Sequence, residues 1–204
     1  MRLIKLSLFV AAGLLMLASP GSAATSPREL VRQTVDQVLE VLRNPALTGQ
    51  PRRESLSRLI RARFDFTIMS QRTLGKNWKD ASRQEQAQFV ALFSDLLEAS
   101  YVGRIEAYSG ETVSYLDERI DADLAEVDTK IHSGNIDIPI SYRMVFENGQ
   151  WFVYDVIIEE ISLIKNYRSS YGEIVRREGY AGLFKRMEEK IRELRAGDAK
   201  QGKG

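Results

Sequence analysis

The stretch WFVYDVIIE, residues 151–159, constrains the fold of this chain more than any other segment. Side chains of a β-strand alternate between the two faces of its sheet, and here both faces are apolar except at Asp155 and Glu159. Asn148-Gly149, just before it, is a strong signal for a two-residue hairpin turn, which pairs this strand with residues 136–147. A strand that is apolar on both faces needs cover on both faces, so the chain must pack helices against its sheet.

The rest of the chain supplies those helices, before and after a run of strands. Alternation of apolar and polar residues predicts an antiparallel meander with strands at 111–119, 124–132, 136–147 and 150–159. Apolar residues at helical spacing, together with capping residues, predict helices at 26–43, 51–63, 65–74, 83–107, 162–177 and 180–195. This order predicts an α+β domain in which helices pack on a curved four-stranded antiparallel sheet.

A two-residue turn also fixes which residues face each other across the last hairpin. One face is predicted to hold the pairs Phe146–Trp151, Met144–Val153, Tyr142–Asp155 and Ile140–Ile157. Asp155 then lies opposite Tyr142 on an apolar face. Such a carboxylate is either a catalytic base or the acceptor of a structural hydrogen bond from Tyr142 or a helix end, and the structural role is favoured.

The predicted helix 83–107 is apolar over more of its girth than a single stripe, which indicates burial on more than one side. This helix and the last hairpin together carry a surplus of apolar and aromatic side chains. If the helices close fully over the sheet, these side chains form an ordinary core. If the helices stand away from the sheet, the space between them is an interior apolar pocket that suits an apolar ligand.

The N-terminus is predicted to be a cleavable signal peptide, residues 1–24. A basic start precedes a short apolar run, residues 6–18, and small residues follow Pro20 where cleavage is expected. The alternative is an uncleaved anchor, although the run is short for crossing a bilayer. The exported remainder is expected to form one domain, residues 25–195, followed by a disordered tail at 196–204.

Composition excludes several classes of function. Removing Arg2 and Lys5 from the 29 basic residues leaves 27 against 28 acidic ones, so the exported part has no electrostatic footprint for nucleic acid. One histidine and no cysteine exclude a cysteine nucleophile and a zinc site built from several such ligands. His132 lies on the charged side of a predicted strand and is expected to be solvated. The sequence contains no nucleotide-binding glycine motif and no nucleophile elbow.

Three segments in a fixed order resemble the MlaC, or toluene-tolerance, family of periplasmic phospholipid-binding proteins. They read FDFTIMSQRTLGKNWKDASRQEQAQFVALFSDLLEASYVGRIEAY, IPISYRMVFENGQWFVYDVIIEEISLIKNYRSSY and EGYAGL. The resemblance covers about residues 28–195. The chain departs from the family pattern at Glu160, where glycine is usual, and this departure concerns the bend that follows the strand.

The resemblance implies a periplasmic phospholipid carrier with an NTF2-like α+β cone. The lipid tails are expected in the interior pocket, with the headgroup near solvent. Two partners are implied: an inner-membrane ABC transporter complex with an MCE-domain subunit, and an outer-membrane lipoprotein complex. The resemblance implies no catalysis and no cofactor apart from phospholipid as the bound ligand.

Candidate lipid-binding residues follow from the apolar faces and the resemblance together. The pocket lining is expected to include Phe66, Met69, Phe93, Leu96, Leu97, Tyr101, Ile105, Ile140, Tyr142, Met144, Val153, Asp155, Ile157, Leu163 and Tyr167. Tyr142, Tyr167 and Arg168 are expected at its mouth, where a polar group meets a glycerophosphate. Arg168 is the best single partner for the phosphate, with an ordinary surface arginine as the alternative.

Two other functions stay open. The same cone could hold an enzyme that acts on a small apolar substrate with Asp155 as its base, although the lack of histidine and cysteine chemistry disfavours it. The chain could also be an exported adaptor with a closed core and no ligand, which the surplus of apolar faces disfavours. A structure without a void beneath the sheet would favour the adaptor.

Overall fold

The computed structural model of the chain describes residues 25–107 and 110–201. The predicted signal peptide at 1–24 and the end of the predicted tail, 202–204, lie outside this part of the chain. Within it, the helices and strands follow one another in the predicted order.

Helices occupy the two ends of the described chain and strands its middle. The helices are α1 (Pro27–Arg43), α2 (Gly49–Arg61), α3 (Phe66–Leu74), α4 (Asn77–Asp80), α5 (Arg83–Glu106) and α6 (Leu163–Gln201). The strands are β1 (Thr112–Asp121), β2 (Leu124–Ser133), β3 (Ile136–Glu147), β4 (Gln150–Ile158) and β5 (Ile161–Ser162). They form one antiparallel sheet in the order β1-β2-β3-β4-β5, so the predicted α+β class is confirmed. The sheet has five strands rather than four because the two-residue β5 pairs with the end of β4.

Side-chain caps set where two central helices begin. At α5, Ser82 Oγ accepts a hydrogen bond from the Glu85 N–H at 3.2 Å, and the Glu85 carboxylate accepts one from the Ser82 N–H at 2.8 Å. At α3, the Asp65 carboxylate accepts a hydrogen bond from the Ile68 N–H at 2.7 Å. Each cap satisfies a backbone donor that the helix itself leaves unpaired and contributes about 1 kcal/mol. Both predicted helix starts are confirmed.

Helix α6 is two helices joined at a sharp break. Gly179 has φ 68° and ψ −174°, a conformation that lies outside the helical region and favours glycine. The break lies between the two helices predicted at 162–177 and 180–195. Beyond Arg195 the helix continues to Gln201, where the sequence predicted the start of a disordered tail.

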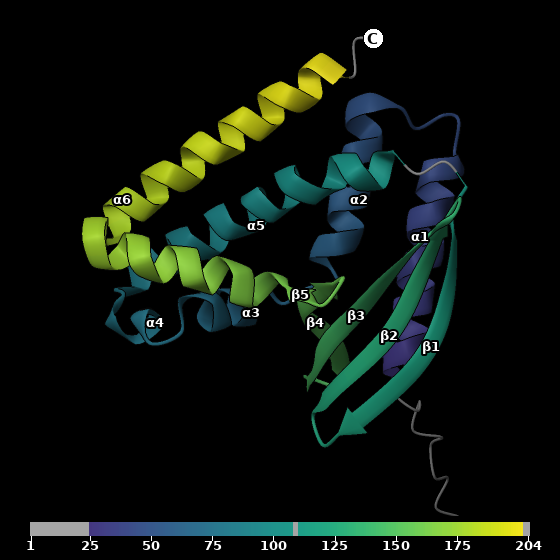
Figure 1. The fold of residues 1–204 in the computed structure, drawn as a ribbon, viewed down its shortest axis with the longest axis horizontal. Helices are drawn as coiled ribbons and strands as arrows, with labels where there is room; N and C mark the ends of the chain where they lie inside the picture. Colours follow the sequence, from purple (N-terminus) through teal and green to yellow (C-terminus); the bar gives the residue numbers. More distant parts are fainter. Residues whose placement is uncertain (1–24, 108–109, 202–204) are drawn as a thin grey trace, which may run out of the picture.

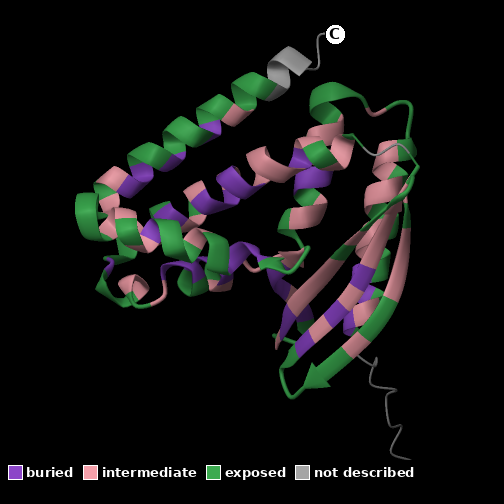
Figure 2. Ribbon diagram, viewed as in Figure 1, coloured by how far each residue is buried: buried purple, intermediate pink, exposed green. Residues whose placement is uncertain are grey.

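The described residues form two hydrophobic cores: α3, α5 and α6 lie to one side in Figure 1, and the sheet with α1 lies to the other. On one side, α3, α5 and both halves of α6 share a hydrophobic core that includes Phe89, Phe93 and Leu183. On the other side, α1 packs against the concave inner face of the sheet around Val127 and Met144. Figure 2 shows the buried residues concentrated along the α5–α6 contact and on the inner strands, whereas most of α1 is half-buried or exposed.

Two aromatic rings belong to both hydrophobic cores. Phe64 and Tyr101 pack at the edge of the helical core and at the edge of the sheet core. Phe64 is held by backbone pairing with β4, since the Asp65 N–H donates to the Val153 carbonyl at 2.9 Å and the Val153 N–H to the Arg63 carbonyl at 2.8 Å. The two cores are therefore joined through Phe64 and Tyr101.

A β-bulge changes the register in the middle of the last hairpin. From the Asn148-Gly149 turn to the pair Met144–Val153, the predicted pairing is confirmed. Tyr154 is then an extra residue on β4, and Arg143 faces Asp155. Beyond the bulge every pair differs from the prediction by one residue. Two consecutive β4 residues, Tyr154 and Asp155, therefore lie on the outer face beside the helical core.

The predicted pairing of Tyr142 with Asp155 is thus wrong, because the bulge moves Asp155 to the opposite face of the sheet. There its carboxylate accepts a hydrogen bond from Ser162 Oγ at 2.6 Å and another from the Ile164 N–H at 3.2 Å. Ser162 Oγ in turn accepts one from the Lys165 N–H at 3.1 Å. The buried carboxylate therefore holds the start of α6 against β4, which is the helix-end role that the sequence analysis allowed.

The turn between β4 and β5 has an unusual backbone. Ile158 pairs with Ile161, so Glu159 and Glu160 form a two-residue turn, and their φ angles are 48° and 68°. Two positive φ angles in a row are typical of a type I′ turn, in which asparagine and glycine are favoured. The left-handed conformation costs an ordinary L-residue roughly 1–2 kcal/mol. This geometry explains why glycine would suit position 160.

Replacing Asp155 with alanine is expected to destabilise the fold by about 2–3 kcal/mol, because the Ser162 hydroxyl and the Ile164 N–H lose their buried acceptor. Urea denaturation followed by circular dichroism measures this difference. Asp36→Ala is the matched control: Asp36 is exposed on α1, and the described residues give it no hydrogen bond or ion pair. It is expected to change the free energy of unfolding by less than about 0.5 kcal/mol. Equal midpoints for the two variants would contradict the anchoring role of Asp155.

Candidate functional site

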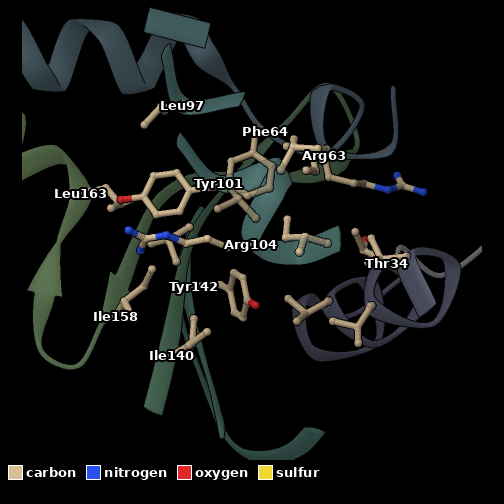
Figure 3. Close-up of a pocket in the computed structure, with 18 of the residues that line it drawn as sticks. Thr34, Arg63, Phe64, Leu97, Tyr101, Arg104, Ile140, Tyr142, Ile158 and Leu163 are labelled. Atoms are coloured by element: carbon tan, nitrogen blue, oxygen red, sulfur yellow. The ribbon is translucent and has the colours of Figure 1, made fainter. Parts of the chain in front are cut away.

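An interior cavity of about 590 Å³ lies between α1, α2, the second half of α5 and the inner face of the sheet (Figure 3). Its volume is within the range of natural small-molecule sites, roughly 300–1,000 Å³. Most of its lining is apolar, and the residues come from elements far apart in the sequence. The helices therefore stand away from this part of the sheet, as the pocket alternative predicted.

Helix α1 contributes an apolar stripe that packs in a protein core at one end only. The stripe consists of Leu30, Val31, Val35, Val38, Leu39 and Leu42, all of which line the cavity. Only Leu30 and Val31 are buried, at the end where α1 contacts the sheet. The remaining four are half-buried because they face the hollow. Their helical spacing is visible in the sequence, but that spacing does not tell a core stripe from a cavity stripe.

The sheet supplies the opposite wall through alternate residues of β1 to β4. These are Val113, Ile131, Ile138, Ile140, Tyr142, Met144, Val153, Val156 and Ile158. The β-bulge places Val156 and Ile158 in this wall. Because Tyr154 and Asp155 share the outer face, Val156 and Ile158 lie on the inner face. Sequence reasoning missed both residues, since it placed the inner face at Asp155 and Ile157.

Ten of the predicted site residues do line the cavity. They are Phe66, Met69, Leu97, Tyr101, Ile105, Ile140, Tyr142, Met144, Val153 and Leu163. They come from α3, α5, β3, β4 and the start of α6, so the fold brings together side chains that are nearly 100 residues apart in the chain. Whether each one contacts a lipid remains a prediction.

The other predicted residues lie elsewhere. Phe93, Leu96 and Tyr167 pack in the helical core, because the broad apolar arc of α5 faces α6 on one side and the cavity on the other. Asp155 and Ile157 are turned away from the cavity by the bulge. These five positions are corrections to the predicted pocket lining.

Arg168 is also not at the cavity. Its guanidinium donates to the backbone carbonyl of Arg72 at the end of α3, with Nε at 2.7 Å and Nη2 as a second donor. It lies directly against Gly75, where a Cβ would be 3.6 Å from Nε. The side chain therefore caps a helix C-terminus, a structural role that is common for arginine. The prediction that it meets a phosphate at the mouth is not supported by this position.

Three arginines line the cavity, and they differ in how they are paired. Arg61 forms ion pairs with Asp95 at 2.9 Å and Glu98 at 2.6 Å, and also donates to Ser94 Oγ at 2.7 Å. Within residues 25–107 and 110–201, neither Arg63 nor Arg104 has a carboxylate at ion-pairing distance. Figure 3 shows that the Arg104 guanidinium lies under the Tyr101 ring and that Arg63 points the other way. Sequence reasoning missed Arg104 because a lone arginine near a helix end gives no pattern.

Tyr142 brings a phenol group into the apolar wall. Burial raises the pKa of its hydroxyl to about 12, because the phenolate loses its hydration there, and the neighbouring Tyr115 adds to the rise. A hydrogen bond with Thr129 has the opposite, smaller effect. The group is therefore a neutral hydrogen-bonding phenol at physiological pH, which fits a lining for an uncharged chain of carbon atoms.

The enzyme hypothesis loses its proposed base in this arrangement, because Asp155 does not face the cavity.

A serine, a histidine and an aspartate are hydrogen-bonded in a row on the sheet. Ser114 Oγ lies 2.8 Å from His132 Nε2, and Asp137 Oδ1 lies 2.7 Å from His132 Nδ1. His132 is therefore half-buried and bonded on both sides rather than freely solvated. These three residues lie on the outer face of the sheet and none lines the cavity, so they form a cross-strand polar ladder.

The described part of the chain offers neither a metal-binding cluster nor a membrane-spanning helix. No group of three or more histidine, cysteine, aspartate or glutamate side chains there is arranged to hold a metal ion. No helix among residues 25–107 and 110–201 is both long and apolar enough to cross a membrane.

The fold and the cavity define a class of α+β proteins in which helices and a curved sheet enclose an interior apolar pocket. Comparison with known proteins identifies the family within that class. A family profile described as MlaC protein matches residues 32–189, more than half of the sequence. The chain therefore belongs to the MlaC family, as the resemblance implied.

Two relatives illustrate the match. The chain is 21% identical over 177 residues to a Haemophilus influenzae protein named intermembrane phospholipid transport system binding protein MlaC. The matched region covers 82% of this chain and 83% of that protein. It is also similar to the solved structure of a phospholipid-binding protein from Ralstonia solanacearum in complex with a phospholipid. That match has a TM-score of 0.76 and 25% identity, and covers 84% of this chain and 99% of the other.

The environment of Tyr142 predicts a late titration. Tyr142→Phe is expected to remove a component near pH 12 from the absorbance titration of tyrosinate at 295 nm, whereas exposed tyrosines ionise near pH 10. Because the folded-state pKa is raised, the neutral phenol contributes stability fully below about pH 10, and that contribution is lost as the pH rises through 12. A difference titration whose missing component centres near pH 10 would show that Tyr142 is solvated.

Proposed function

We propose that this protein is a periplasmic carrier that binds phospholipid and shuttles it between membrane complexes, with the acyl tails in the interior cavity. The observation that carries the proposal is the apolar cavity of about 590 Å³ in a chain of the MlaC family. The names of the two relatives, one a transport-system binding protein and one bound to a phospholipid, support it.

The chemistry of the lining matches acyl tails. Burial of each CH₂ group is favourable by roughly 0.8 kcal/mol, so two tails of about 15 carbons each amount to a gross 20–25 kcal/mol. A lipid cannot cross water at a useful rate unless a protein offers comparable burial. The α1 stripe and the inner face of the sheet are apolar surfaces that touch at one end and line the cavity elsewhere, where the tails would complete the packing between them.

The headgroup is proposed to stay at the edge of the cavity, near Arg104. Arg104, Ile158 and Leu163 lie together on one side of it in Figure 3, and we call this edge the rim. Arg104 has no ion pair among the described residues, so its guanidinium is available to a phosphate. No reaction on the lipid is proposed, and the predicted base, Asp155, is not part of the cavity lining.

Export and partners complete the proposal. A cleavable signal peptide would place the mature chain in the periplasm, where it would receive and deliver lipid at two complexes: an inner-membrane ABC transporter with an MCE-domain subunit and an outer-membrane lipoprotein complex. The near-neutral charge of the mature sequence gives no reason to expect nucleic acid as a partner. The closed-core adaptor is contradicted by the cavity itself.

The direct test is the mass of what the purified full-length chain carries. Native mass spectrometry, followed by extraction into organic solvent and thin-layer chromatography, is expected to show phospholipid bound to the protein. Protein that stays free of lipid after incubation with phospholipid vesicles would overturn the proposal.

Filling the cavity is expected to abolish lipid loading without unfolding the chain. Leu39→Trp places an indole in the hollow rather than in a packed core, so we expect at least a fivefold fall in bound lipid with the circular dichroism spectrum unchanged. The matched control is Gln33→Trp, which adds the same ring to the exposed side of α1. Equal lipid loading in the two variants would contradict the cavity as the binding site.

A further inference from the structure

The Glu159-Glu160 turn is the feature of the fold that the proposed function does not yet explain. Both residues have positive φ angles, 48° and 68°, in a turn whose geometry favours asparagine and glycine. Residues held in disfavoured backbone conformations cluster at binding and catalytic sites, where their side chains have a role. A glutamate pair at this turn therefore costs backbone free energy that asparagine and glycine would avoid.

The turn lies at the rim of the cavity. Ile158 immediately precedes it and Leu163 follows three residues after it, and both side chains line the cavity beside Arg104 (Figure 3). The backbone is anchored there, since the Glu159 N–H donates to the Pro139 carbonyl at 3.1 Å. The turn is therefore a fixed part of the rim rather than a loose loop.

Both carboxylates are available to a ligand. Glu159 and Glu160 are exposed, and no basic side chain within the described ranges pairs with either of them. Arg104, which lies at the same rim, likewise has no ion pair within those ranges, and its guanidinium carbon lies 5.6 Å from the centre of the Tyr101 ring. One uncommitted cation and two uncommitted anions thus share one edge of an apolar cavity.

We propose that this rim recognises a zwitterionic headgroup, with the phosphate at Arg104 and the ammonium group at the Glu159-Glu160 turn. The inference rests on the proposed function and names its substrate class: phospholipids whose headgroup carries an amine, such as phosphatidylethanolamine, in preference to phosphatidylglycerol. Charge-assisted contacts of both signs form only with a headgroup that carries both charges.

A basic surface of a protein partner would also suit two glutamates. The lipid is the better occupant because Arg104 shares the rim and would repel such a surface, whereas a zwitterion satisfies both charges at once. The rim also adjoins the cavity that would hold the tails, so the headgroup of a bound lipid reaches the turn without any further binding event.

The test is competitive loading from mixed vesicles. The delipidated full chain is incubated with vesicles of equal parts phosphatidylethanolamine and phosphatidylglycerol with identical acyl chains, and the bound lipids are quantified after extraction. Exposed ion pairs are weak, so we expect about a threefold enrichment of phosphatidylethanolamine. The double variant Glu159→Gln/Glu160→Gln is expected to load as much total lipid with no enrichment. Glu188→Gln/Glu189→Gln removes two exposed, adjacent glutamates of α6 that lie outside the cavity lining, and should keep the enrichment.

A second variant separates the side chains from the backbone strain. Glu159→Asn/Glu160→Gly suits the turn geometry, so it is expected to raise the melting temperature while losing the enrichment. Arg104→Gln is expected to lower loading of both lipids, because both carry the phosphate.

Two results would overturn the inference. One is loading without enrichment in the unsubstituted chain. The other is enrichment that survives Glu159→Gln/Glu160→Gln, which would leave a protein partner as the occupant of the turn. No loading of either lipid would instead overturn the proposed carrier function.

Discussion

The hydrogen bonds of Asp155 are the constraint on which the arrangement of this molecule depends. The bulge at Tyr154 places that carboxylate on the outer face of the sheet, where Ser162 Oγ and the Ile164 N–H donate to it at 2.6 and 3.2 Å. This contact ties the start of α6, and with it the helical core, to β4. The same bulge returns the rest of β4 to the inner face, so one local irregularity both anchors the helices and builds one wall of the cavity.

Dividing the apolar residues into two cores is what leaves the hollow. The helical core is complete without the sheet's inner face, and α1 closes only one end of the sheet core, through Leu30 and Val31. The rest of the α1 stripe is only half-buried and lines the cavity, and Phe64 and Tyr101 pack against both cores. Apolar surface that neither touches protein nor excludes water gains little from folding, so a bound hydrocarbon chain would add stability that the chain alone lacks.

Sequence patterns predicted most of this fold but only part of the cavity. Caps and periodicity placed the helices, and the Asn148-Gly149 turn set the first half of the hairpin correctly. The bulge was invisible because the residues on either side of it are apolar on both faces, so a shift by one residue leaves the pattern unchanged. The broad arc of α5 indicated burial on two sides without showing which side was hollow, which is why Phe93 and Leu96 were assigned to the pocket. The sequence does not show that Arg168 caps α3 whereas Arg104 lines the cavity, because these roles depend on which residues the fold places beside each arginine.

Affinity and selectivity have separate physical sources in such a site. The tails gain free energy in proportion to the apolar area they bury, at roughly 0.8 kcal/mol per CH₂, whatever headgroup they carry. A headgroup at an exposed rim makes contacts that water screens, each worth roughly 0–1 kcal/mol. A carrier must also release its lipid, and release is slowed by every strong contact at the headgroup. Weak, charge-based selection at the edge of a deep apolar cavity is therefore compatible with transport, whereas a buried phosphate clamp would oppose it.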